Sequence, residues 1–318
     1  MHNHKTTKLN IFHSIASFSS SKKTILTLGT FDGVHIGHKK ILERLIQNTK
    51  NKEFESLVLT FFPHPRMVLQ EKSEIKLLNT IPEKIDLLES IGIENLVIHP
   101  FDETFSRLTA EEFVEKILVD QFHIHKIIIG YDHRFGRNRT ANIDDLIVFG
   151  EKYGFEVEQI SVQELNDISV SSTKIRKAIE EGDICLTNSY LGYDYFLTGT
   201  VVEGKQLGRT IGFPTANLNI EEDYKLIPKT GVYVVKSTID DKVVPGIMNI
   251  GVNPTLGENT LTVEIHYLDF DANLYGKQLK VSILQYIREE QKFDSLESLK
   301  IQIQNDKEQA VSYIKSLN

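Results

Sequence analysis

Two hydrophobic patterns follow each other along the chain. In the first half, short apolar runs alternate with stretches in which apolar residues recur at helical spacing. The apolar runs predict buried strands at residues 24–28, 56–62, 96–98 and 126–129. The helical pattern occupies residues 39–47, 82–91 and 111–120. Strands that alternate with helices predict an α/β domain, a Rossmann-like parallel sheet with helices on both faces.

The second half changes to closely spaced strands. Segments rich in β-branched residues, separated by turns that contain glycine, lie at residues 196–202, 231–238, 243–250, 261–268 and 278–287. Because no helical pattern lies between them, they predict a mainly antiparallel β-barrel.

A helix is expected after the last strand. Asp294 is its predicted N-cap, and Glu297 stands three residues later, as in a capping box. Its apolar face is formed by Leu296, Leu299 and Ile303. The period of the pattern changes near residues 184–195, so we expect an N-terminal domain at 1–185 and a C-terminal domain at 186–318.

Composition narrows the class of protein. The 318 residues are 40% hydrophobic and 25% charged, which is typical of a globular protein with two domains. A formal net charge of -8 argues against nucleic acid as a partner. No apolar run approaches the roughly 18 residues of a membrane span, so no membrane partner is expected. The single cysteine, Cys185, excludes an intramolecular disulfide and favours a cytoplasmic location. The serines and lysines of residues 19–23 are interpreted as a short lead-in to the first strand.

The segment at residues 29–38, GTFDGVHIGH, follows the first strand and opens the first helix. Its glycines allow the backbone to approach a phosphate, and a helix N-terminus offers free N–H groups to an anion. His35 and His38 share one face of the opening turn and can donate hydrogen bonds to a triphosphate. An arbitrary histidine pair is more often exposed or capping, but this one follows a strand and a glycine turn. Nucleotide contacts are expected from Gly29, Phe31, Asp32 and Gly37.

A second motif stands at residues 171–176, SSTKIR. Taken alone, Ser171, Ser172 and Thr173 are typical of helix caps. Together with Arg176 and the histidine segment, they resemble the H-x-G-H and S-S-T-x-x-R signature of the nucleotidyltransferase superfamily. The resemblance implies that these hydroxyls and the arginine hold ATP phosphates, and that His35, His38 and Arg176 are catalytic.

Two further stretches resemble the FAD synthetase module of that superfamily. They are residues 62–65, FPHP, and residues 130–136, GYDHRFG, in which His133 replaces the usual phenylalanine. Ala141 and Asn142 stand where glycine and aspartate are usual. The resemblance implies that ATP adenylylates FMN to FAD with release of pyrophosphate. It also implies flavin contacts from Phe62, Pro63, His64, Pro65, Asp132 and Phe135.

The most informative stretch of the second half is residues 199–217, GTVVEGKQLGRTIGFPTAN. A glycine-rich barrel corner would explain it, and it lacks the spacing of a P-loop. It resembles the riboflavin kinase motif, which implies that Thr215 and Asn217 bind Mg²⁺ and nucleotide. The expected phosphate contacts are Gly199, Gly204, Gly208 and Gly212.

Glu264 and Arg288 complete that resemblance. By itself, Glu264 fits an outward-facing residue of an alternating strand. In the kinase family its position is that of the general base, which accepts the proton of the ribityl hydroxyl that attacks the γ-phosphate of ATP. Arg288 is expected to cover the flavin.

The resemblances together indicate a prokaryotic bifunctional riboflavin kinase/FAD synthetase. Riboflavin, FMN and ATP are the expected substrates, FAD the final product and Mg²⁺ the cofactor, while the oligomeric state stays open. Three alternatives remain: a chain with one active site, a class I aminoacyl-tRNA synthetase and a non-enzymatic flavin sensor. The absence of a K-M-S-K-S-like loop disfavours the synthetase, and the presence of Glu264, Thr215 and Asn217 disfavours the sensor.

Overall fold

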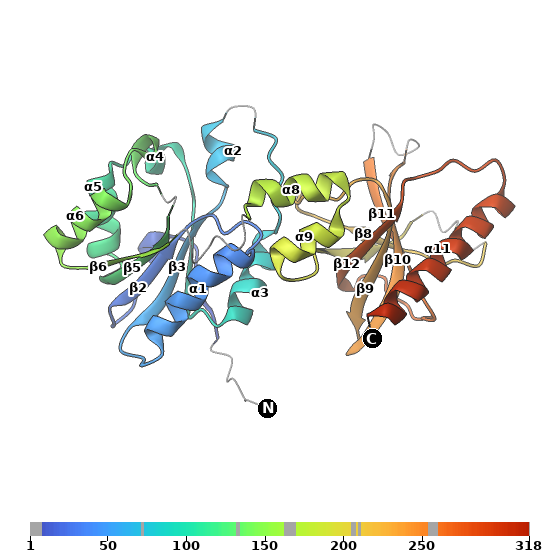
Figure 1. The fold of residues 1–318 in the computed structure, drawn as a ribbon, viewed down its shortest axis with the longest axis horizontal. Helices are drawn as coiled ribbons and strands as arrows, with labels where there is room; N and C mark the ends of the chain where they lie inside the picture. The colour runs from blue at the N-terminus through green and yellow to red at the C-terminus, as the bar shows by residue number, and fades with distance from the viewer. Residues whose placement is uncertain are drawn as a thin grey trace. The chain divides into compact units, whose positions relative to one another are not determined.

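The chain forms two compact units, Met1–Ser171 and Ser172–Asn318 (Figure 1). The structure, a computed structural model, describes residues 8–70, 73–131, 134–161, 170–204, 208, 211–253 and 260–317. Within these residues, no helix has the length and apolarity that crossing a membrane requires.

The first unit is built on a six-stranded parallel sheet. In spatial order its strands are β1 (Asn10–Phe12), β4 (Asn95–His99), β3 (Glu55–Phe61), β2 (Thr24–Leu28), β5 (Ile124–Gly130) and β6 (Glu156–Ile160). All five residues of β2 are buried, because this strand lies inside the sheet with both faces covered.

Helices cover both faces of this sheet. On one face, α1 (Ile36–Thr49) and α3 (Ile81–Ile91) contribute Leu42, Leu45 and Leu88 to a buried core. The other face carries α5 (Ala110–Phe113), the π-helix η2 (Val114–Val119) and α6 (Ile143–Tyr153) over a second core. Shorter elements are η1 (Ile15–Ser17), α2 (Pro65–Leu69), α4 (Glu103–Ser106) and η3 (Arg137–Arg139). The predicted α/β class is confirmed.

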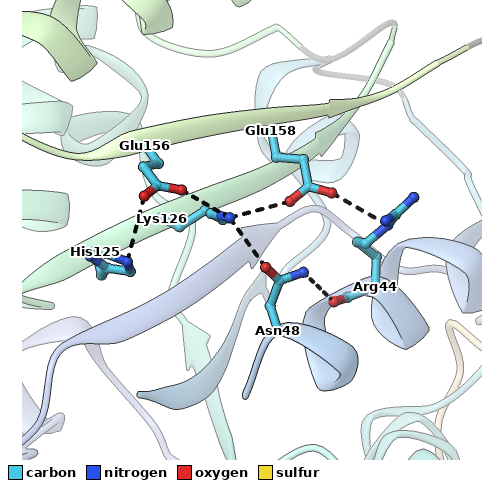
Figure 2. A network of polar contacts seen from close by, with 6 residues as sticks. All are labelled: Arg44, Asn48, His125, Lys126, Glu156 and Glu158. Atoms are coloured by element: carbon cyan, nitrogen blue, oxygen red, sulfur yellow. Dashed lines mark hydrogen bonds and ion pairs between the residues drawn. The ribbon is translucent and has the colours of Figure 1, made fainter. Parts of the chain in front are cut away.

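A polar network fastens α1 to the strands β5 and β6 (Figure 2). Lys126 of β5 binds Glu156 at 2.9 Å and Glu158 at 3.6 Å, both on β6. The same ammonium group donates to Asn48 of α1, and Arg44 of α1 pairs with Glu158 at 3.3 Å. Its members are half-buried or exposed, so the network sets the packing of α1 more than it adds stability.

The second unit contains a closed six-stranded barrel. Around the barrel the strands are β10 (Lys242–Asn253), β11 (Thr260–Tyr267), β8 (Ala216–Asn219), β7 (Phe196–Val202), β12 (Gln278–Arg288) and β9 (Gly231–Ile239). Every neighbouring pair is antiparallel, as the sequence predicted. Two helices precede the barrel, α8 (Ser172–Glu181) and α9 (Ile184–Leu191). Asn188 of α9 donates to the carbonyl of Ile283 on β12 at 2.9 Å, which ties this helix to the barrel.

The C-terminal helix α11 (Leu296–Ser316) packs Ala310 against the barrel. Its predicted N-cap, Asp294, is wrong by one residue. The N-cap is Ser295, whose hydroxyl accepts from the N–H of Ser298 at 3.1 Å, while the Ser298 hydroxyl accepts from the N–H of Ser295. Serine and aspartate are similarly good N-caps, so either residue could open the helix. The reciprocal bonds with Ser298 form at Ser295, and the helix therefore begins one residue later than predicted.

Two candidate active sites

The first candidate site lies where the order of the parallel strands reverses. From β2 the chain continues outward to β3 and β4, then returns to place β5 on the other side of β2. Ligands of open α/β sheets bind at the carboxyl ends of the strands at such a reversal. Gly29 follows β2 and Gly130 ends β5, so the predicted stretches at residues 29–38 and 130–136 both open there.

The loop that enters α1 has an unusual backbone. Phe31, Gly33 and Val34 have φ of 44°, 88° and 36°, which is the left-handed region that β-branched valine in particular avoids. Val34 is fully buried, and Asp32 accepts from the N–H of Leu78 at 2.9 Å, so the surrounding contacts hold this conformation. Strained turns of this kind concentrate at ligand sites.

The two histidines of the first motif stack on each other. Their ring centroids are 3.6 Å apart with an interplanar angle of 16°. His35 is the N-cap of α1, and its Nδ1 accepts from the N–H of His38 at 3.3 Å. A neutral His35 therefore carries its proton at Nε2 and can donate from there. Nδ1 of His38 is enclosed and has no hydrogen-bond partner within the described residues.

Both rings are neutral at pH 7. Burial lowers the pKa of His35 to about 4. Burial, followed by the charges of His35 and Lys84, holds the pKa of His38 well below its usual value. Two imidazolium ions stacked this closely would repel each other strongly. The pair consequently offers neutral donors to a bound anion.

The predicted flavin residues of this unit lie on two segments. The peptide bond Phe62–Pro63 is cis, His64 caps α2 by accepting from the N–H of Arg66, and Pro65 is the first residue of that helix. Phe135 is buried beside Phe113, with ring centroids 6.0 Å apart. Asp132 and His133 lie outside the described residues.

Two of the three departures from the family pattern, Ala141 and Asn142, fit the local fold. Ala141 is buried and pairs with Phe135 in an isolated β-bridge. Asn142 is the N-cap of α6 and accepts from the N–H groups of Asp144 and Asp145. An aspartate would cap this helix in the same way.

The SSTKIR segment spans the point in the sequence where the first unit ends and the second begins. Ser171 ends the first unit, while Ser172, Thr173 and Arg176 lie in the first five residues of α8. Residues four apart share a face of a helix, so Ser172 and Arg176 are neighbours on α8. The pairing of these side chains with the histidines stays a prediction.

The second candidate site is a row of polar residues across three adjacent strands of the barrel. Glu264 of β11 lies directly opposite Asn249 of β10 and opposite Asn217 of β8. The Thr215 hydroxyl donates to Oε2 of Glu264 at 3.1 Å. These side chains are all half-buried, with apolar core residues at the alternating positions between them. The predicted residues Thr215, Asn217 and Glu264 are thus brought together, and Asn249 joins them.

One of the predicted glycines, Gly204, brings the backbone close to this row. A Cβ on Gly204 would collide with the side chain of Asn217, and one on Gly199 with the carbonyl of Asn219. The carbonyl of Gly208 accepts from the N–H groups of Ile211 and Phe213. Gly212 has φ of 87° and open space around it. The residues between them, 205–207 and 209–210, lie outside the described part.

Arg288 is held by a buried carboxylate of α11. Its Nε and Nη2 donate to Asp306, the closer contact being 2.7 Å, and Asp306 is 2% exposed. Gln302 donates to the same carboxylate, and the Arg288 guanidinium lies 5.9 Å from the ring centroid of Phe293. Contact of Arg288 with flavin stays a prediction.

Sequence reasoning missed Lys84 and gave Asn249 no role of its own. Lys84 of α3 is 3% exposed and donates from Nζ to the carbonyl of Thr30 at 2.7 Å, directly beneath the histidine loop. Its signal was a lysine on the apolar face of a helix, between Ile81 and Leu88. Asn249 begins a stretch, residues 249–255, that resembles the riboflavin kinase pattern, and the strand register adds its place opposite Glu264.

Comparisons with known proteins cover both halves of the chain. The family model of FAD synthetase matches residues 17–174, and that of riboflavin kinase matches residues 191–314. A bifunctional riboflavin kinase/FMN adenylyltransferase of Listeria monocytogenes is 35% identical, over 92% of this chain and 93% of its own. The protein of the same description from Bacillus subtilis is also 35% identical, over 93% and 94%.

A solved structure has a similar fold over nearly the whole length. It is described as a macrolide-efflux protein from Streptococcus pneumoniae, with a TM-score of 0.85 and 29% identity over 94% of this chain and 97% of that chain. The two family models and the relatives above therefore place this chain in the family of bifunctional riboflavin kinase/FMN adenylyltransferases.

Proposed function

We propose that the barrel row built around Glu264 performs the kinase step and that the histidine loop of the first unit performs the adenylyl transfer. As a member of its family, the chain phosphorylates riboflavin to FMN and adenylylates FMN to FAD, using ATP in both reactions. The observation that carries the assignment is the cross-strand row Asn249–Glu264–Asn217, which gathers residues far apart in the sequence on one face of the barrel.

In the kinase step, Glu264 acts as the general base. Its carboxylate accepts the proton of the ribityl 5′-hydroxyl as that oxygen attacks the γ-phosphorus of ATP, and ADP leaves. The Thr215 hydroxyl, which now donates to Glu264, fixes the orientation of the carboxylate. Gly204 leaves the Asn217 amide the room to point along the row.

In the adenylyl step, the FMN phosphate attacks the α-phosphorus of ATP, and pyrophosphate leaves. The attacking phosphate is already ionised, so no base is required, and the site acts by positioning and by stabilising charge. His35 donates from Nε2, and the free N–H groups at the start of α1 face the same anion. We assign Ser171, Ser172, Thr173 and Arg176 to the ATP phosphates, in accord with the superfamily motif.

Mg²⁺ is the proposed cofactor. The barrel row offers the hydroxyl of Thr215 and the amide oxygen of Asn217, which are the hard oxygen donors that this ion prefers when nucleotide phosphates complete its shell. Among the described residues no group of three or more histidines, cysteines or carboxylates could hold a metal alone, which suits an ion that arrives with ATP. When bound, it neutralises phosphate charge during transfer. We also propose a cytoplasmic location, because a single cysteine, Cys185, suits a reducing compartment.

The test is a time course with purified protein, riboflavin, ATP and Mg²⁺, followed by chromatography of the flavins. We expect FMN to rise first and FAD to follow. FMN without FAD would leave the first unit without its proposed activity. If FMN as substrate gave FAD while riboflavin gave nothing, the kinase assignment would be wrong. Binding of flavin with no consumption of ATP would favour a flavin sensor.

A further inference from the structure

A buried lysine lies beneath the histidine loop, on a helix outside both sequence motifs. Nζ of Lys84 donates to the carbonyl of Thr30 at 2.7 Å, and the Thr60 hydroxyl donates to the same carbonyl at 3.2 Å. Thr30 stands between Gly29 and Phe31, at the start of the left-handed turn. Lys84 therefore holds the loop from below at its first residues.

The ammonium group is costly to keep in this place. A neutral donor can satisfy a carbonyl, as Thr60 already does, whereas burial of a charged amine removes its hydration. Burial lowers the pKa of Lys84 to about 8, and the charge of Asp32 opposes this change. At pH 7 the amine is mostly protonated. The fold consequently retains a buried positive charge that the anchoring of Thr30 alone does not require.

That charge acts on the histidine pair. Together with burial and with His35, Lys84 disfavours protonation of His38. The ring of His38 also packs edge-on against Phe31, at 5.2 Å, so loop, ring and lysine form one assembly. A triphosphate bound above it would meet neutral donors at the surface and a fixed positive charge behind them. A fixed positive charge in a site without water stabilises an anion more than a positive charge exposed to water does.

We propose that Lys84 is a positioning residue for adenylyl transfer, which fixes the loop through the Thr30 carbonyl and supplies a buried positive charge behind two neutral histidines. The inference rests on the proposed activity of the first unit. Lys84 acts through the loop and through the electrostatic potential, because at 3% exposure it is enclosed by protein.

The proposal predicts a pH dependence. The charged or titratable groups around Lys84 are Asp32 from the loop and His38 from α1, with Glu83 next to it on α3 capping Thr80. Both histidines are already neutral near pH 7, so among these groups Lys84 is the one that changes charge as the pH rises through about 8. In the free enzyme kcat/KM for ATP should therefore fall as Lys84 loses its proton.

The experiment compares the full-length wild type with Lys84→Met and Lys84→Arg. FMN adenylylation is measured from about pH 6 to about pH 10, separately for kcat and KM, with riboflavin phosphorylation by the same samples as the control for folding. Since the kinase activity reports only on the second unit, the near-UV circular dichroism of each variant shows whether the first unit is folded as well. For a folded Lys84→Met we expect a loss of about 100-fold in kcat/KM for ATP at pH 7 and the loss of the alkaline fall. Lys84→Arg should keep most of the activity without that fall, because arginine stays charged. Lys116→Met, an exposed lysine of the same unit, should match the wild type.

Two outcomes overturn the inference. One is a Lys84→Met protein that adenylylates FMN at the wild-type rate. The other is a Lys84→Arg protein that keeps the alkaline fall of the wild type, and this variant decides the matter if Lys84→Met does not fold. A wild type that forms no FAD would instead refute the proposed function of the first unit, so the two failures are distinguishable.

Discussion

The two candidate sites are built in opposite ways. In the first unit, His35 and His38 are three residues apart and owe their geometry to one strained turn after one strand. In the barrel, Thr215, Asn249 and Glu264 come from separate parts of the chain and meet through strand register. The first site is a buried assembly of neutral rings over a lysine, and the second is a half-buried row on a sheet face. A local motif can therefore be recognised in the sequence, whereas a row of residues across strands can be recognised only once the strand pairing is known.

The largest effect is expected from Glu264→Gln, which removes the carboxylate from the middle of the row. Loss of a general base lowers the rate about 10²- to 10⁴-fold. Riboflavin phosphorylation should fall by that factor, while FMN adenylylation by the same protein stays unchanged. Initial rates with each substrate measure this. Glu289→Gln is the control, since Glu289 is exposed and binds Lys229. A kinase rate within a few-fold of the wild type would remove Glu264 from the role of base.

Asp306→Ala tests how much the buried ion pair with Arg288 stabilises the second unit. In the wild type, Arg288 is 16% exposed and donates from Nε and Nη2 to this carboxylate. The substitution leaves its mostly buried charge without that partner. Removal of one member of such a pair costs about 3–5 kcal/mol. Denaturant titration followed by the loss of kinase activity should show a lower midpoint. Glu308→Ala, at an exposed carboxylate of the same helix that accepts from Gln304, should leave the midpoint unchanged. Equal midpoints for both variants would contradict the structural role of Asp306.

His38→Ala tests the candidate site of the first unit. It deletes one ring of the stacked pair, and removal of one donor to a developing anion costs about 10²- to 10³-fold in kcat. FMN adenylylation should fall accordingly and riboflavin phosphorylation should not. His13→Ala, an exposed histidine of the same unit, is the matched control. The assignment fails if both histidine variants adenylylate FMN equally well.

The buried histidines also predict that stability depends on pH. The folded-state pKa of His35 is about 4, below the ordinary value of 6.5, so the unfolded chain binds a proton first as the pH falls. The stabilisation is complete above pH 6.5 and is lost as the pH falls toward 4, by about 3 kcal/mol in all. Denaturant unfolding at several pH values should show a smaller loss for His35→Gln than for His13→Gln. Identical slopes would mean that His35 is not buried and neutral.

Local pattern was sufficient for most of the fold. The predicted strands at 24–28 and 196–202 have the observed bounds of β2 and β7, because a fully buried strand and a strand between glycine turns leave clear limits. The predicted helix at 111–120 is an α-turn that continues as a π-helix, a distinction that periodicity does not make. The edge strands β1 and β6 were missed, since neither has a strong apolar run and both depend on pairing with a neighbour.

Among the site residues, too, those fixed by local spacing could be predicted and those fixed by tertiary packing could not. His35 and His38 could be predicted because spacing within one helical turn fixes their separation. The pairing of Asn249 with Glu264 could not be predicted, since it is set by the register of β10 and β11. Lys84 could not be assigned either, because only tertiary packing brings α3 beneath the Thr30 carbonyl. The shift of the helix cap from Asp294 to Ser295 reflects two adjacent residues that are both good caps.

The most direct test of two independent sites in one chain is a mixing experiment. Glu264→Gln and His38→Ala proteins are each incubated with riboflavin, ATP and Mg²⁺, alone and together, and the flavins are separated. Two independent sites predict no product from Glu264→Gln, only FMN from His38→Ala, and FAD from the mixture. If the mixture still stopped at FMN while Glu264→Gln converted added FMN to FAD, FMN would not pass freely between molecules. If Glu264→Gln formed no FAD from added FMN, the account of separate sites would be contradicted.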